Sequence, residues 1–293
     1  MRLFQLLTQY LPYWIVLVGI LGYLAPTPAA LSDFLVPWLL FLLILGLGLT
    51  LNVRDFRSKL SWKEIFGLLL LQLIILPTTA ILLSLAFPPG PLRDGIFVLG
   101  LVPAEITSPL MASMARGDAV LSAIFLILSM LVSLLIIPFV AGTHVAVSLA
   151  IELSFSVILP LAIGVIVRRW FWQPRRELCD ALSVTAVLGL IFLACTALST
   201  VGLLPLLLLV GLSLVIVVAG FGWGMLIGRC IGATHKRLIS LIFFSGMREF
   251  GVAVAIAVSA FPYGAGIPAA IYGPIMIFVA GTTASFLKKR SAL

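Results

Sequence analysis

The chain has 293 residues, of which 62% are hydrophobic and only 10% are charged, whereas about 25% of the residues in average soluble proteins are charged. A mean hydropathy of +1.28 leaves more apolar side chains than a water-bounded core can hold, so much of the surface must face lipid. This composition excludes a soluble globular enzyme and predicts an all-α polytopic membrane protein. The net charge of +8 does not imply a nucleic-acid partner, because membrane topology concentrates basic residues on one side of the bilayer.

Apolar stretches recur along the whole chain. A helix needs about 20 residues to cross a hydrocarbon core of about 30 Å, and stretches near this length predict ten transmembrane helices. The expected ranges are 10–25, 34–51, 63–87, 94–114, 119–140, 150–168, 181–199, 203–228, 237–260 and 266–286.

The basic residues predict the orientation of these helices. With these ten spans, sixteen of the eighteen Lys and Arg residues fall on one side of the membrane and Arg93 falls on the other. The remaining residue, Arg248, lies inside a span. Because cytoplasmic loops carry the excess of Lys and Arg, both termini are expected in the cytoplasm of a multi-pass protein of the cell membrane.

Five spans precede residue 143 and five follow it. An odd number of spans in each half makes the halves enter the membrane in opposite orientations, so residues 1–142 and 143–293 are predicted to form two inverted five-helix repeats. Such repeats are common in secondary transporters, whose sites lie near mid-membrane where discontinuous helices meet.

The fourth span of each half contains the only charged side chains deep in the hydrophobic segments. Glu105 lies between Pro103 and Pro109, and two glycines flank the Arg248–Glu249 pair. Proline removes a backbone donor and glycine weakens a helix, so both spans are predicted to be broken. Unwound backbone at membrane depth requires an internal, protein-lined site.

The three charges leave one net negative charge when both carboxylates are ionised. A bound Na⁺ or a proton would neutralise it, and we expect this cation to be the coupling ion. A purely structural bridge between Glu105 and Arg248 is the alternative interpretation.

At these residues the chain resembles the bile acid/sodium symporter family, which belongs to a superfamily with the arsenite efflux permeases. The resemblance implies ten helices in two inverted repeats, with the fourth and ninth helices broken and crossing. It rests on Gly46-Leu-Gly-Leu-Thr50 with Arg54-Asp-Phe56, Gln72 before Pro77, Pro103 to Gly117-Asp118 with Ser122, Gly246-Met247 with Gly251-Val-Ala253, and Pro268-Ala-Ala-Ile-Tyr272.

The resemblance also implies sodium ligands, at Gln72, Ser108 and Ser122 and in the main chain around Ser245 and Met247. Other family ligands are replaced here, by Pro109, Leu126, Phe244 and Arg248. We interpret Arg248, where the family has a glutamine, as a permanent cation in the place of a sodium ion, with Glu105 opposite as its partner.

These features together predict a secondary transporter that moves a small organic anion with Na⁺ or H⁺ by alternating access. The resemblance implies that spans one, two, six and seven form a panel that moves against the other six. Apart from Na⁺ no cofactor is expected, and the oligomeric state stays open. The expected substrate and coupling residues are Glu105, Thr107, Ser108, Arg248 and Glu249.

Two other functions remain as alternatives. A membrane sensor would bind the ligand without transporting it. An arsenite-type efflux permease would share the glutamate of the ninth span, here Glu249, but its fourth helix needs a cysteine that this span lacks. An enzyme is not expected, because the spans contain no Ser–His pair, aspartate pair or HExxH motif.

Overall fold

The fold was analysed in a computed structural model of the chain. Within the part of the chain that it describes, the regular structure is helical. The described residues are 10–25, 29–50, 61–141, 159–170, 178–179, 181–182, 184–189, 192, 203–261 and 264–290.

The chain divides into two compact units. The first comprises Met1–Lys59 and Ala150–Thr200, and the second comprises Leu60–Leu149 and Val201–Leu293. Each unit therefore takes segments from both predicted repeats. The division matches the grouping of spans one, two, six and seven that the resemblance implies.

Glycines allow close packing of two helices in the first unit. A Cβ atom on Gly48 would lie 2.6 Å from the carbonyl oxygen of Leu161, and one on Gly164 would lie 2.8 Å from the Cα atom of Gly48. Arg168 Nη1 also donates a 2.7 Å hydrogen bond to the carbonyl oxygen of Leu49. The helices of this unit are α2 (Leu11–Leu24), α3 (Ala29–Thr50) and α10 (Leu159–Trp170), of which α3 and α10 make these contacts.

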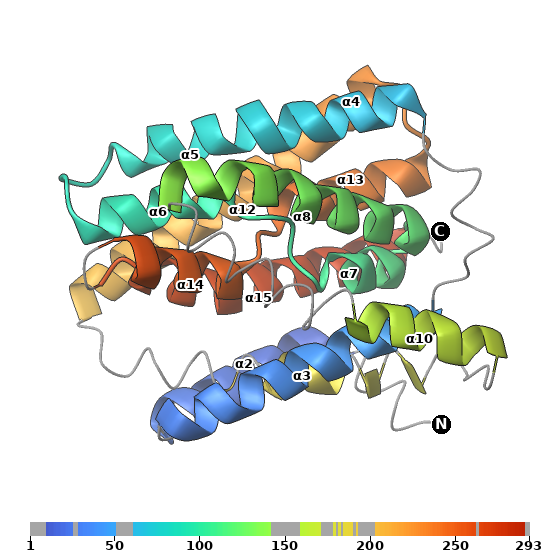
Figure 1. The fold of residues 1–293 in the computed structure, drawn as a ribbon, viewed down its shortest axis with the longest axis horizontal. Helices are drawn as coiled ribbons and strands as arrows, with labels where there is room; N and C mark the ends of the chain where they lie inside the picture. Colours follow the sequence, from blue (N-terminus) through green and yellow to red (C-terminus); the bar gives the residue numbers. More distant parts are fainter. Residues whose placement is uncertain are drawn as a thin grey trace. The chain divides into compact units, whose positions relative to one another are not determined.

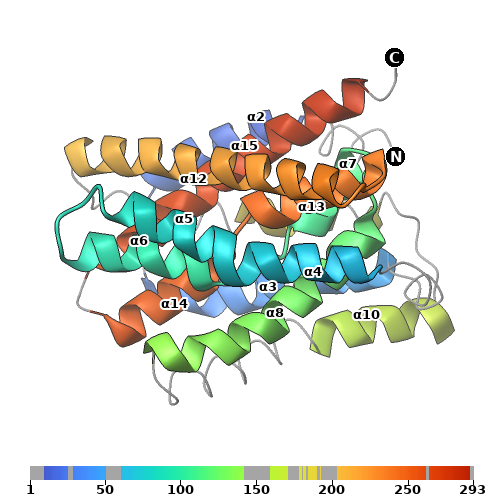
Figure 2. The same ribbon diagram turned by 90° about the horizontal axis from the view of Figure 1, so that it is seen from above.

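The second unit contains two interrupted helices that run in opposite directions (Figures 1 and 2). One consists of α6 (Pro91–Leu101) and α7 (Ser108–Met114), and the other of α13 (His235–Gly246) and α14 (Phe250–Ala260). Helix α13 contacts α7, and α14 contacts α6. The prediction that both spans are broken is confirmed. The unit also contains α8 (Ala119–Ala141), α12 (Leu203–Cys230) and α15 (Ile267–Arg290).

A π-helical segment interrupts the first helix of this unit. The order is α4 (Trp62–Leu70), the π-helical η2 (Leu71–Ile75) and α5 (Leu76–Ser84). Pro77 has no N–H group to donate and its ring crowds the carbonyl four residues earlier, so a regular α-helix is disfavoured immediately before it. The wider turn contains Gln72, whose side chain is fully buried.

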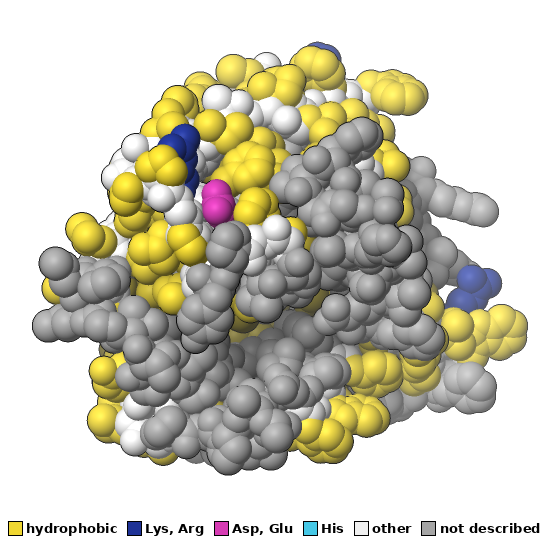
Figure 3. Space-filling model, turned by 60° about the vertical axis from the view of Figure 1, so that its left-hand side comes forward, with side chains coloured by type: hydrophobic (Ala, Val, Ile, Leu, Met, Phe, Trp, Pro, Cys, Tyr) yellow, Lys and Arg dark blue, Asp and Glu magenta, His cyan; other side chains and the backbone are white. Residues whose placement is uncertain are grey.

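Most predicted spans coincide with helices to within a few residues. The first half of span 150–168 and about half of span 181–199 lie outside the described residues. Three described helical runs are long and apolar enough to cross a membrane: Trp62–Ser84, Leu206–Cys230 and Ile267–Lys288. Figure 3 shows that the described side chains on one face are mainly hydrophobic, as lipid contact requires.

Candidate functional site

The two helix breaks of the second unit bond to each other through their main chains. Glu105 N donates to Met247 O over 3.0 Å, and Glu249 N donates to Pro103 O over 3.0 Å. Ala104 and Arg248 face each other in this short antiparallel bridge. The extended backbone is thus satisfied at membrane depth, where an unpaired N–H or C=O group costs several kcal/mol. We call this arrangement the crossover.

Tyr272 of α15 supports the crossover from one side. Its hydroxyl donates to Gly246 O over 3.0 Å and accepts a 3.2 Å hydrogen bond from Arg248 N. The ring is fully buried. One phenol group therefore satisfies the carbonyl of the last residue of α13 and the N–H of Arg248 within the break.

Arg248 turns its guanidinium toward the end of α6. Nε donates to Leu99 O over 3.4 Å, and Nη2 donates to Gly100 O over 3.3 Å and also to Val102 O. Nη1 donates to Gln72 Oε1 over 2.8 Å. These oxygens include the last carbonyls of a helix, which have no partner within the helix itself. Arg248 therefore caps α6 in addition to carrying charge.

The expected partnership between Arg248 and Glu105 is wrong. Although both side chains are only 2% exposed, the described residues contain no ion pair between them. Carbonyl and amide oxygens take up the guanidinium donors instead. Counting charges along the sequence overlooked these acceptors, because every residue type supplies a carbonyl.

The two glutamates lie close to each other on the opposite side of the bridge. Their carboxyl groups are close enough to influence each other electrostatically, and Glu249 Oε2 accepts a 3.2 Å hydrogen bond from Ile106 N. Glu105 Oε2 is buried without a hydrogen-bond partner. Two adjacent buried carboxylates repel each other unless a proton or another cation lies between them.

Three buried hydroxyl groups at the starts of α7 and α8 also have no hydrogen-bond partner among the described residues. Thr107, Ser108 and Ser122 are each at most 1% exposed, and none of their oxygens has a hydrogen-bond partner in the described structure. Thr107 and Ser108 begin α7, and Ser122 lies in the first turns of α8. Buried polar atoms without a hydrogen-bond partner are rare in proteins and indicate a site for a water or an ion, or another functional role.

Two serines that the sequence analysis did not single out complete the polar network around Gln72. Ser129 Oγ donates to Gln72 Oε1 over 3.2 Å and accepts from Ala104 N over 2.8 Å. Ser133 Oγ accepts from Gln72 Nε2 over 3.0 Å and lies 3.2 Å from Leu101 O. Their spacing of seven and eleven residues from Ser122 places all three serines on one helical face, which is the signal that could have found them.

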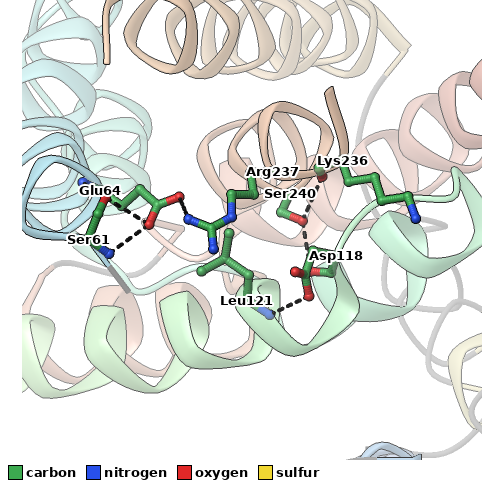
Figure 4. Close-up of polar contacts among 7 residues, drawn as sticks. All are labelled: Ser61, Glu64, Asp118, Leu121, Lys236, Arg237 and Ser240. Atoms are coloured by element: carbon green, nitrogen blue, oxygen red, sulfur yellow. Dashed lines mark hydrogen bonds and ion pairs between the residues drawn. The ribbon is translucent and has the colours of Figure 1, made fainter. Parts of the chain in front are cut away.

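A second polar cluster holds the far ends of the same helices (Figure 4). Ser61 and Glu64 form a capping box at the start of α4, and Glu64 Oε1 pairs with Arg237 Nη1 at 2.7 Å. Asp118, between α7 and α8, donates from its N–H to Lys236 O over 3.2 Å. The start of α13 is thereby tied to α4 and to the α7–α8 connection.

A comparison with known protein families identifies the family of the chain. A family model described as "Sodium Bile acid symporter family" matches residues 37–204, more than half of the chain. The chain belongs to this family. The resemblance inferred from the sequence motifs is confirmed, and with it the assignment to a family of sodium-dependent membrane transporters.

Individual relatives of this symporter-family chain are distant. The "Uncharacterized sodium-dependent transporter YocS" of Bacillus subtilis (strain 168) is 26% identical over 274 residues, which cover 88% of this chain and 84% of that protein. The "Probable sodium/metabolite cotransporter BASS1, chloroplastic" of Arabidopsis thaliana is 25% identical over 268 residues, which cover 85% of this chain and 66% of that protein.

The sodium ligands expected for a member of the symporter family differ in whether their oxygen atoms already take part in hydrogen bonds. Gln72 Oε1 already accepts hydrogen bonds from Arg248 and Ser129. Ser245 Oγ lies 2.8 Å from both Gly220 O and Leu241 O, and Met247 O accepts from Glu105 N. Ser108 and Ser122 alone among the five keep an uncommitted side-chain oxygen.

Proposed function

We propose that this chain is a secondary active transporter that moves a small organic anion across the cell membrane together with Na⁺ or H⁺. In this proposal ten helices form two inverted repeats, 1–142 and 143–293, with both termini in the cytoplasm. Alternating access comes from movement of the unit that contains α2, α3 and α10 against the unit that contains the crossover.

The observation that carries the proposal is the meeting of three buried ionisable side chains at two interrupted helices. Glu105, Arg248 and Glu249 are each 2% exposed. A charge in the membrane interior costs at least about 2.5–3.5 kcal/mol, and such residues mark substrate and ion pathways. Because three residues at one place each carry this free-energy cost, a functional role is favoured over a chance arrangement.

The charges and oxygen atoms of the crossover support a site for the coupling ion there. With both carboxylates ionised, the three side chains leave one net negative charge. Among the described residues, buried oxygens without a hydrogen-bond partner occur on Glu105 in the crossover and on Thr107, Ser108 and Ser122 at the starts of α7 and α8. Carboxylate and hydroxyl oxygens suit a hard cation, and a shared carboxyl proton is the other solution.

An organic anion is the substrate class that best fits the chain. The family is named for bile acids, which are anionic, and Arg248 contributes a positive charge at the crossover. Its N–H groups already bond to carbonyl oxygens, so the charge supports this assignment more than the donors do. A pocket beside Arg248 has a volume of about 20 Å³, room for about one water. The proposal therefore requires the site to open before an anion enters.

Flux in reconstituted liposomes tests the proposal. Organic carboxylates and sulfonates that raise the melting temperature of the purified protein are first selected as ligands. Uptake of these ligands is then measured with an inward Na⁺ gradient, with an inward H⁺ gradient and without either. We expect one gradient to drive accumulation.

Matched carboxyl variants locate the coupling site. Glu105→Gln should lower gradient-driven uptake at least tenfold, because it removes a charge that the cation neutralises. Asp94→Asn is the control, since Asp94 is a partly exposed carboxylate in the first turn of α6, and it should leave uptake nearly unchanged. Uptake indifferent to both gradients contradicts coupling. Ligand binding without any uptake favours the sensor.

A further inference from the structure

The guanidinium of Arg248 is surrounded by oxygen atoms of a kind that also bind metal cations. The three carbonyl oxygens of Leu99, Gly100 and Val102 and the amide oxygen of Gln72 all accept from it. We propose that Arg248 is a tethered cation, which permanently fills an oxygen cage that would otherwise bind a monovalent metal cation such as Na⁺. The effect of this tethered cation on ion coupling rests on the proposed transport function. The proposal that Arg248 fills the cage does not depend on that function.

The cage has the chemistry of a cation site. Neutral carbonyl and amide oxygens are ligands for hard cations. The carbonyls belong to the end of α6, an eleven-residue helix, where the helix dipole places partial negative charge. No carboxylate among the described residues forms an ion pair with Arg248, and the cage oxygens accept hydrogen bonds from the guanidinium instead.

The cage does not depend on Arg248 for its shape. Gln72 Nε2 bonds to Val102 O over 3.1 Å and to Ser133 Oγ over 3.0 Å, and Ser129 Oγ holds the amide oxygen. These bonds fix the Gln72 side chain from the other end. We therefore expect the four oxygens to stay in place when the guanidinium is removed.

An ion could reach the cage from a small space beside it. The residues that line the pocket of about 20 Å³ include Leu99, Gly100 and Arg248 of the cage as well as Thr79 and Ser245. This volume holds a water-sized species. Because an arginine cannot dissociate, the filled cage would contribute charge without exchanging an ion, and the chain would carry one exchangeable cation fewer than a relative with a neutral residue at position 248.

Sodium binding to Arg248 variants tests this proposal. Arg248→Gln removes the charge and adds an amide oxygen, whereas Arg248→Met removes the charge and adds no oxygen ligand. Purified proteins in detergent are compared in choline and sodium buffers, with ²²Na⁺ binding and melting temperature as readouts. We expect Arg248→Gln to bind about one Na⁺ more per chain than the unaltered protein.

The same variant should gain thermal stability from sodium. A tenfold excess of Na⁺ over its dissociation constant should raise the melting temperature of Arg248→Gln by about 3 to 6 °C more than that of the unaltered protein. Arg248→Met should gain neither binding nor stability. A folded Arg248→Gln protein without added sodium binding, or an equal gain in Arg248→Met, overturns the proposal.

A second variant keeps the test decisive if Arg248→Gln does not fold. Gln72→Met retains Arg248 and removes one cage oxygen. Its Na⁺ stoichiometry should equal that of the unaltered protein, because the Gln72 oxygen is closed to exchangeable ions; loss of a bound Na⁺ would show that the cage was never filled. Both readouts are independent of substrate. If Arg248→Gln binds an additional Na⁺ but no anion is transported in liposomes, the proposed transport function is refuted, whereas the proposal that Arg248 fills the cage is supported.

Discussion

Replacing Tyr272 with phenylalanine removes one oxygen atom and two hydrogen bonds of the crossover. The Arg248 N–H and the Gly246 carbonyl lose their shared partner, while the ring can keep its fully buried position. A buried polar group left unsatisfied costs about 1–3 kcal/mol, but hydrogen bonds between membrane helices average only about 0.6 kcal/mol and reach about 1.7. Because the site is fully buried and two groups lose their partner, we expect the free energy of unfolding to fall by about 2–3 kcal/mol.

The melting temperature of the purified protein in detergent measures this loss. For a chain of this size, 1 kcal/mol corresponds to about 2–4 °C, so Tyr272→Phe should lower the melting temperature by about 5–10 °C. Tyr23→Phe is the matched control, because Tyr23 is 46% exposed on α2. If the two variants differ by less than 1 °C, the phenol does not hold the crossover together and the reasoning fails.

Three further substitutions probe other contacts by the same melting assay. Ser129→Ala leaves the buried Ala104 N–H without its acceptor and should cost about 1–3 kcal/mol; Ser129→Cys, which keeps a weak acceptor, should cost less. Arg237→Met should cost about 1 kcal/mol, since Glu64 is buried but Arg237 is 28% exposed, and high salt should shrink the difference if it is electrostatic. Gly164→Leu should destabilise strongly by forcing α3 and α10 apart; an unchanged melting temperature would contradict the close packing.

The helices and their interruptions could be predicted because their causes are local. Runs of apolar residues fix where the chain is helical, and the breaks follow from proline on either side of Glu105 and from glycine before Arg248. The π-helical turn at Gln72 was missed, although Pro77 five residues later is its visible cause.

The partners of the buried charges could not be predicted in the same way. Charged residues can be recognised in a sequence, so Glu105 was the expected partner of Arg248. The carbonyl oxygens at the end of α6 come within hydrogen-bonding distance of Arg248 only in the folded chain. The role of Ser129 was hidden for a related reason. Ser129 Oγ accepts a hydrogen bond from the Ala104 N–H, and this N–H is free to donate only because the chain is extended there.

The main-chain bonds between Pro103 and Glu249, and between Glu105 and Met247, make the meeting point of the two halves largely independent of side-chain identity. Any residue except proline can occupy positions 105 and 249 and still donate its amide. Substitutions at these two positions can therefore change which ion or substrate is bound while the main-chain bridge between the two helix breaks stays intact.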